Sequence, residues 1–205
     1  NLFDSVFVYQ YSDSSHSFVR KTGTAVYYGS TVEMLDLNGD EHPEALVYTN
    51  AGGNDPVVGN GLTVLSYTRN GYTTPVTLDG GDPEVVTIDA QPKPVVAIKV
   101  FSDYWPDNLS HAESVRFLDS LIILRNITAT EKTALEQRLF QQVLAEAEEE
   151  YRQAKNRYAE RQDDEAASDV YAAAVRAIKY YEKLGMQDSI RKLSESEGKF
   201  WRGAL

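Results

Sequence analysis

The stretch TVEMLDLNGDEHPEALVYT, residues 31–49, places a polar loop between two runs typical of β-strands. The runs VEML and EALVYT are rich in apolar and β-branched residues. Between them, DLNGDEHPE at 36–44 holds five side chains that carry oxygen and one glycine. The pattern predicts a β-hairpin whose loop either binds a cation or forms a polar turn.

The spacing of the oxygen-bearing residues in this loop suits calcium. Calcium takes six to eight oxygen ligands, and a short loop supplies them when ligands alternate along the chain. Positions 1, 3, 5, 7 and 9 would be filled by Asp36, Asn38, Asp40, the carbonyl of His42, and Glu44. Asn-Gly-Asp is also ordinary turn chemistry, so a metal-free hairpin turn stays open.

Composition and charge narrow the function classes. The chain has 205 residues, 42% of them hydrophobic, and a net charge of −11, which predicts a globular protein that repels nucleic acid. The 16 acidic and 7 basic side chains of residues 1–125 give that part most of the charge. Cysteine is absent, which excludes disulfides, thiol nucleophiles and thiolate metal sites. We expect a chain processed before Asn1, and any contact with a membrane only through an anchor upstream.

The strand and helix patterns predict an α+β protein. Strand-like runs and turn-forming clusters fill the first 125 residues. A helical stripe then begins, formed by Leu135, Leu139, Val143, Ala147, Tyr151, Ala154 and Tyr158. Thr128 and Glu131 have the form of a capping box at its start. We therefore expect an antiparallel β domain at 1–126 and a helical domain at 127–205.

The β domain contains two degenerate copies of one segment. Residues 31–49 align with EVVTIDAQPKPVVAIKV at 84–100, and FVYQY at 7–11 aligns with TVLSY at 63–67. A repeat of about 55 residues predicts two meander units. The second loop keeps Asp89 but none of the other ligands, so the sequence predicts a single metal site.

The loop at 36–44 resembles the calcium loop of FG-GAP and VCBS repeats, which occur in integrin-like propellers. The family pattern, roughly D-x-N/D-G/x-D-G-x-x-D, is matched at Asp36, Asn38, Gly39 and Asp40. This sequence departs from the pattern at Glu41, where the family usually has Gly, and at Glu44, where the family usually has Asp. The resemblance covers residues 5–101 and implies a structural calcium ion. Two copies are too few for a closed propeller, so we expect a small twisted sheet or sandwich.

The region after residue 126 predicts two antiparallel helices that meet near Asp163–Asp164 and end at Gly185. The spacing of Tyr151, Tyr158, Ala167, Tyr171 and Ala174 resembles a tetratricopeptide (TPR) unit, which implies a module for binding proteins. A generic helical hairpin is the alternative, because only one such unit is visible. DSIRKLSESEGKFW at 188–201 predicts a third helix that carries Trp201.

No catalytic signature emerges from the sequence. It has no G-x-S-x-G elbow, no phosphate-binding glycine loop, and no pair of histidines at metal-ligand spacing. Asp79 and Asp82 would support acid–base catalysis only within a shared cleft.

We therefore expect a non-enzymatic, exported bacterial protein of the periplasm or cell surface. It would join one calcium-stiffened β domain to a helical module that binds a protein partner, and a lipidated cysteine upstream would make it a lipoprotein. A metal-independent scaffold subunit is the alternative, and a hydrolase using carboxylates is a further one.

Overall fold

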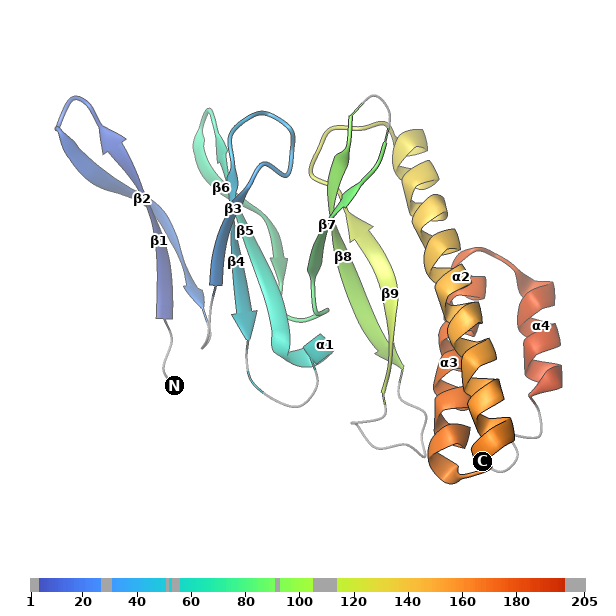
Figure 1. The fold of residues 1–205 in the computed structure, drawn as a ribbon. Coiled ribbons are helices and arrows are strands. Elements are labelled where there is room, and N and C mark those ends of the chain that lie inside the picture. The colour runs from blue at the N-terminus through green and yellow to red at the C-terminus, as the bar shows by residue number, and fades with distance from the viewer. Residues whose placement is uncertain are drawn as a thin grey trace. The chain divides into compact units, whose positions relative to one another are not determined.

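The α+β class is confirmed by a computed structural model of the chain, which describes residues 4–26, 31–50, 52, 56–90, 93–104 and 114–197. Strands come first and long helices follow, as the change of pattern near residue 126 predicts (Figure 1). One short helix, α1 (Pro56–Gly59), interrupts the strands.

The described strands form three sheets rather than one. The first is the hairpin of β1 (Asp4–Ser12) and β2 (Ser17–Val26). The second is a four-stranded meander, which we call the middle sheet; its strands are β3 (Thr31–Leu35), β4 (Glu44–Asn50), β5 (Asn60–Thr68) and β6 (Gly71–Leu78). The third has the order β7 (Glu84–Ile88), β8 (Val95–Tyr104), β9 (Val115–Ile122). The hairpins β1–β2, β3–β4, β5–β6 and β7–β8 are all antiparallel.

The central strands of the middle sheet, β4 and β5, are buried on both faces. Successive residues of a strand point to opposite faces, so β4 supplies Leu46 to one and its neighbours Ala45 and Val47 to the other. The first face packs in one cluster with residues of the third sheet, among them Ile98. The second face packs against Val6 and Val8 of β1. Because both faces are covered, β4 and β5 read as continuous apolar runs rather than as a strict alternation.

Three helices follow the strands: α2 (Ala129–Arg161), α3 (Asp164–Lys183) and α4 (Gln187–Ser196). The predicted capping box of Thr128 and Glu131 starts α2. Asp163 caps α3 by accepting a hydrogen bond from the Ala166 backbone N–H. Gly185 follows α3 with a φ of +70°, a conformation that glycine adopts without strain. The capping box, the junction near Asp163–Asp164 and the stop at Gly185 are confirmed, and the cap formed by Asp163 adds to them.

Small residues bring α2 and α3 close together. Ala154 is fully buried and forms one cluster with Val170 and Ala173, flanked by Tyr151 and Tyr158. Of the two alanines in the TPR-like spacing, Ala174 is buried and Ala167 is only half-buried. The third predicted helix exists as α4, while Trp201 lies outside the described residues.

The chain separates into two compact units. One, which we call the β unit, comprises residues 1–100 and 121–126, and the other, the helical unit, comprises residues 101–120 and 127–205. Within the second unit, the Leu118 backbone N–H donates to the Tyr180 hydroxyl at 3.0 Å, and Lys183 forms an ion pair with Asp119 at 2.8 Å. Residues 101–120 therefore belong with the helices through defined contacts. Among the described helices, none has the length and apolar character needed to cross a membrane.

A buried carboxylate links α2 to the end of the helical unit. Glu197 is 1% exposed and accepts hydrogen bonds from the Tyr151 hydroxyl and from Lys155, the latter at 2.8 Å. Burial acts to raise the pKa of Glu197, but the hydrogen bonds from Lys155 and Tyr151 outweigh it and lower the pKa below its ordinary value. The charged form of Glu197 is therefore the one the folded unit stabilises.

Replacing Ala173 by Leu should force α2 and α3 apart, since Ala173 is 2% exposed within the helical contact. We expect a loss of about 1–3 kcal/mol in the free energy of unfolding, the usual cost of overpacking. Urea unfolding followed by helical circular dichroism measures it. Ala159→Leu, a change at an exposed position of α2, is the control. Equal stability of the two variants would contradict the close packing.

The lowered pKa of Glu197 predicts a pH dependence. A carboxyl group whose pKa is lower in the folded state stabilises that state above its unfolded pKa, about 4.3, and this stability is lost as the pH falls through the folded value. Glu197→Gln should therefore reduce the free energy of unfolding at pH 7 and leave a flatter decline below about pH 4.3. Urea unfolding between pH 7 and pH 3 compares the two proteins, and parallel curves would exclude this role.

Candidate metal-binding loop

The loop at 36–44 joins β3 to β4 at the edge of the middle sheet. Leu35 and Glu44 are cross-strand partners, so eight residues close the hairpin. Gly39 has a φ of +80° and Glu41 a φ of +69°, both in the left-handed region. Gly39 adopts this conformation freely, whereas Glu41 is strained there. FG-GAP and VCBS loops usually carry Gly at the position of Glu41, and the backbone conformation here favours Gly at that position too.

Asp36 organises the first half of the loop. Its Oδ1 accepts hydrogen bonds from the backbone N–H groups of Gly39 at 2.7 Å and Asp40 at 3.2 Å. Its Oδ2 accepts one from the Glu41 N–H at 3.0 Å. One carboxylate therefore fixes three successive peptide groups, including the strained one.

Asn38 and Asp40 continue the network. The Oδ1 of Asn38 accepts from the Asp40 N–H, and the Oδ1 of Asp40 accepts from the His42 N–H, both at 2.8 Å. The Asn38 side-chain amide donates to Asp40 Oδ2 at 3.1 Å and to Glu44 Oε1 at 2.9 Å. The amide group thus lies between two carboxylates, where positive charge is favoured.

Glu44 is the buried member of the set. It is 1% exposed, and its Oε2 accepts from the Leu37 backbone N–H at 2.8 Å. Its Oε1 accepts from Asn38 and from the Ser66 hydroxyl of β5, the latter at 3.0 Å. Within the described residues, these donors are neutral and no basic side chain lies at ion-pair distance from Glu44. Arg125 lies beside Gly39, but its guanidinium donates to the Pro94 carbonyl at 3.1 Å.

The structure thus brings four of the five predicted ligand residues into one hydrogen-bonded network: Asp36, Asn38, Asp40 and Glu44. His42 donates its backbone N–H to Asp40, and its side chain is exposed. Among the described residues, no group of three or more His, Cys, Asp or Glu side chains is arranged to hold a metal. Asp36, Asp40 and Glu44 therefore share hydrogen-bonded partners in the loop without their carboxylates being gathered around one point.

Sequence reasoning missed Ser66 and the burial of Glu44. Ser66 lies 22 residues after Glu44 in the chain and is 8% exposed. It reaches Glu44 only because β4 pairs with β5. The sequence signal for Glu44 is its place directly before the apolar run ALV, which makes it the first residue of a buried strand.

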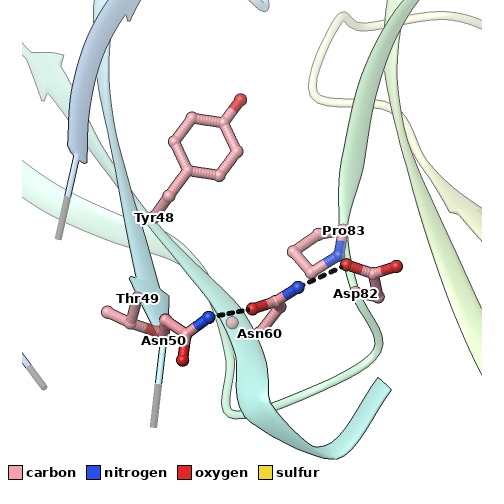
Figure 2. A pocket seen from close by; sticks show the side chains of 7 residues that line it. Tyr48, Thr49, Asn50, Asn60, Asp82 and Pro83 are labelled. Carbon is pink, nitrogen blue, oxygen red and sulfur yellow. Dashed lines mark hydrogen bonds between the residues drawn. The ribbon is translucent and has the colours of Figure 1, made fainter. Parts of the chain in front are cut away.

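A second polar site lies at the far end of the hairpin formed by β4 and β5. A pocket of about 230 Å³ lies there, lined by Tyr48, Asn50, Asn60 and Asp82, among others (Figure 2). Asn50 donates to Asn60 at 2.8 Å, and Asn60 donates to Asp82 at 2.7 Å. Of the two carboxylates considered for acid–base catalysis, Asp82 lines the pocket. Asp79 is not among its described lining residues. As described, it lacks the pair of carboxyl groups that such a mechanism needs.

Comparison with models of protein families, with characterised proteins and with solved structures finds no match to this chain.

Replacing Glu41 by Gly should relieve the left-handed strain at φ +69°. We expect the free energy of unfolding to rise by about 1 kcal/mol in the presence of a chelator, since a side chain in this region costs about that much. Urea unfolding, followed by hydrogen exchange of the β4 and β5 amides, measures it. Glu41→Ala removes the same charge and keeps the strained Cβ, so it should show no comparable gain. A gain of equal size in both variants would assign the effect to charge.

Proposed function

We propose that this chain is a non-enzymatic, exported bacterial protein whose β unit is stabilised by one calcium ion in the 36–44 loop. In this proposal, Asp36, Asn38, Asp40, the carbonyl of His42, and Glu44 hold the ion. Calcium would supply a local positive charge that neutralises clustered carboxylates and pins the hairpin. Its role is structural, and the chain's own residues perform no reaction.

The observation that carries this proposal is the buried Glu44 carboxylate at the end of the loop. A carboxylate that is 1% exposed is costly to keep charged unless a cation or several hydrogen bonds compensate it. Here its described partners are neutral donors. The donor types support a hard cation, because three carboxylates and one amide belong to a single loop, and binding would require their oxygen atoms to turn toward one point.

The repeat is part of the same proposal. β1 and β5 each have nine residues, and β3 and β7 each have five. A cross-strand aromatic pair occurs at corresponding places in two hairpins: Tyr11–Phe18, with ring centroids 5.4 Å apart, and Tyr67–Tyr72, at 5.2 Å. These similarities support the assignment of β1–β4 and β5–β8 as two copies of one FG-GAP-like unit.

The helical unit is proposed to bind a protein partner. The close contact of Ala154 with Val170 and Ala173, flanked by two tyrosines, supports the TPR-like comparison. Export is part of the same proposal and rests on the resemblance to FG-GAP and VCBS repeats.

A metal-independent scaffold is the second candidate, and the closed network of the loop favours it. Asp36 alone accepts three backbone hydrogen bonds, and Glu44 accepts three hydrogen bonds in all. A loop with this many internal bonds forms a stable turn without an ion. The two candidates differ in one measurable property, the effect of calcium on stability.

Calcium at about 2 mM should raise the free energy of unfolding of the β unit relative to excess chelator. For a dissociation constant of about 10⁻⁴–10⁻³ M, typical of extracellular modules, the expected gain is about 0.6 to 1.8 kcal/mol. Thermal and urea unfolding in both buffers measure it. The variant Asp36→Asn/Asp40→Asn, which keeps hydrogen-bond acceptors and removes two charges, should lose the gain.

Asp89→Asn provides the matched control, because Asp89 opens the corresponding second loop, which lacks the other ligands. It should keep the full response to calcium. If the wild-type protein gains no stability from calcium, the loop is a polar turn and the metal-independent scaffold is the better description.

A further inference from the structure

The first sheet is half the size of the middle sheet. Among the described residues, β1 pairs only with β2, whereas β5, at the corresponding place in the second copy, pairs with β4 on one side and β6 on the other. The edge of β1 that faces away from β2 therefore has no strand paired to it in the part of the chain that the structure describes, and we call it the free edge of β1. Such an edge is a template for an additional strand.

Two apolar side chains of β3, Val32 and Met34, are exposed, and we call them the apolar shelf. Val32 is 47% exposed and Met34 is 58% exposed. Their cross-strand partners are Val47 and Ala45, so all four side chains lie on one face of the middle sheet. Val47 and Ala45 are buried beneath β1, while Val32 and Met34, only one strand away, are not.

The free edge of β1 and this shelf are adjacent. Val6 and Val8 of β1 pack on residues of β4 and β5, and β2 contacts β6. Since the strand order of the middle sheet is β3-β4-β5-β6, β3 lies on the side of β1 that faces away from β2. A strand added to the free edge of β1 would therefore lie over Val32 and Met34.

The other face of the hairpin is aromatic. Phe7 is 41% exposed, Tyr9 53%, and Phe18, beyond them on β2, 71%. Phe7 and Tyr9 correspond to Thr63 and Leu65 of β5, which are 8% and 2% exposed. The hairpin thus presents apolar surface at positions that are covered in the second copy.

We propose that the free edge of β1 binds an extended strand from a separate protein partner. The strand pairs antiparallel with β1, lays alternate aliphatic side chains on Val32 and Met34, and places the others beside Phe7 and Tyr9. β-Strand addition of this kind gains affinity from main-chain hydrogen bonds and specificity from alternate side chains. The β1–β2 hairpin, residues 4–26, holds two acidic and two basic side chains, so the net charge of the chain does not oppose docking there.

A second copy of this chain does not fit the same edge. Val6 and Val8 point toward the middle sheet. In an antiparallel β1–β1 pair, both copies would direct these residues to the same side, and the partner's middle sheet would then occupy the space over Val32 and Met34. An isolated strand has no sheet beneath it and avoids this overlap.

The chain itself supplies a probe for the edge. β4 pairs with β5 through Leu46↔Val64 and Tyr48↔Leu62, and the corresponding residues of β1 are Val8 and Val6. A peptide with the sequence EALVYTN, residues 44–50, flanked by lysines for solubility, should pair with β1 in the same way. Its Leu and Tyr side chains would then rest on the shelf.

Titration of the ¹⁵N-labelled chain with this peptide tests the proposal. We expect saturable shifts of the β1 amides and of the Val32 and Met34 resonances, and none with a scrambled peptide that carries the same lysines. Val32→Lys/Met34→Lys should weaken association by at least about tenfold, because the docked strand would bury unpaired charge. Val32→Ser/Met34→Ser should weaken it less, and Val58→Lys, a change at an apolar position that is 61% exposed, should leave it unchanged.

Absence of shifts in β1, equal shifts with the scrambled peptide, or indifference to the lysine pair would overturn the proposal. So would a concentration-dependent dimer in sedimentation that Val32→Lys/Met34→Lys abolishes, since it would assign the edge to a second copy. The outcome is independent of the calcium response of the 36–44 loop, because the peptide contacts neither Asp36 nor Asp40.

Discussion

The hydrogen bonds to the Glu44 carboxylate are the constraint on which the β unit depends. They join the Leu37 backbone, the Asn38 side chain and the Ser66 hydroxyl, so one buried group ties the loop to β5 across β4. A buried carboxylate is tolerated only when it is compensated, which makes the fold of the loop and the register of the sheet mutually dependent. In the proposed function, calcium completes this compensation.

From this constraint the packing of the sheets follows. With Leu35 opposite Glu44, Leu46 faces the third sheet, and Ala45 and Val47 face β1. A shift of the register by one residue would exchange the two faces. The same register leaves Val32 and Met34 on the open part of one face, so the loop and the exposed shelf are consequences of one pairing.

Local chemistry made the helices and the hairpin predictable. The capping box at Thr128, the cap at Asp163 and the glycine at 185 fixed helix ends by contacts within a few residues. The β3–β4 hairpin and the four clustered loop residues were predictable for the same reason. The division of the strands into three sheets was not, because it depends on contacts between residues far apart in sequence. The same holds for the bond between Ser66 and Glu44.

In the proposed function, the 36–44 loop holds a calcium ion through Glu44. The most direct measurement is a calorimetric titration of the metal-free protein with calcium, repeated with Glu44→Gln. The account predicts one ion per chain for the native sequence and a much weaker or absent heat for the variant. A chain that binds no calcium, or a variant that binds it as tightly as the native protein, would contradict the account.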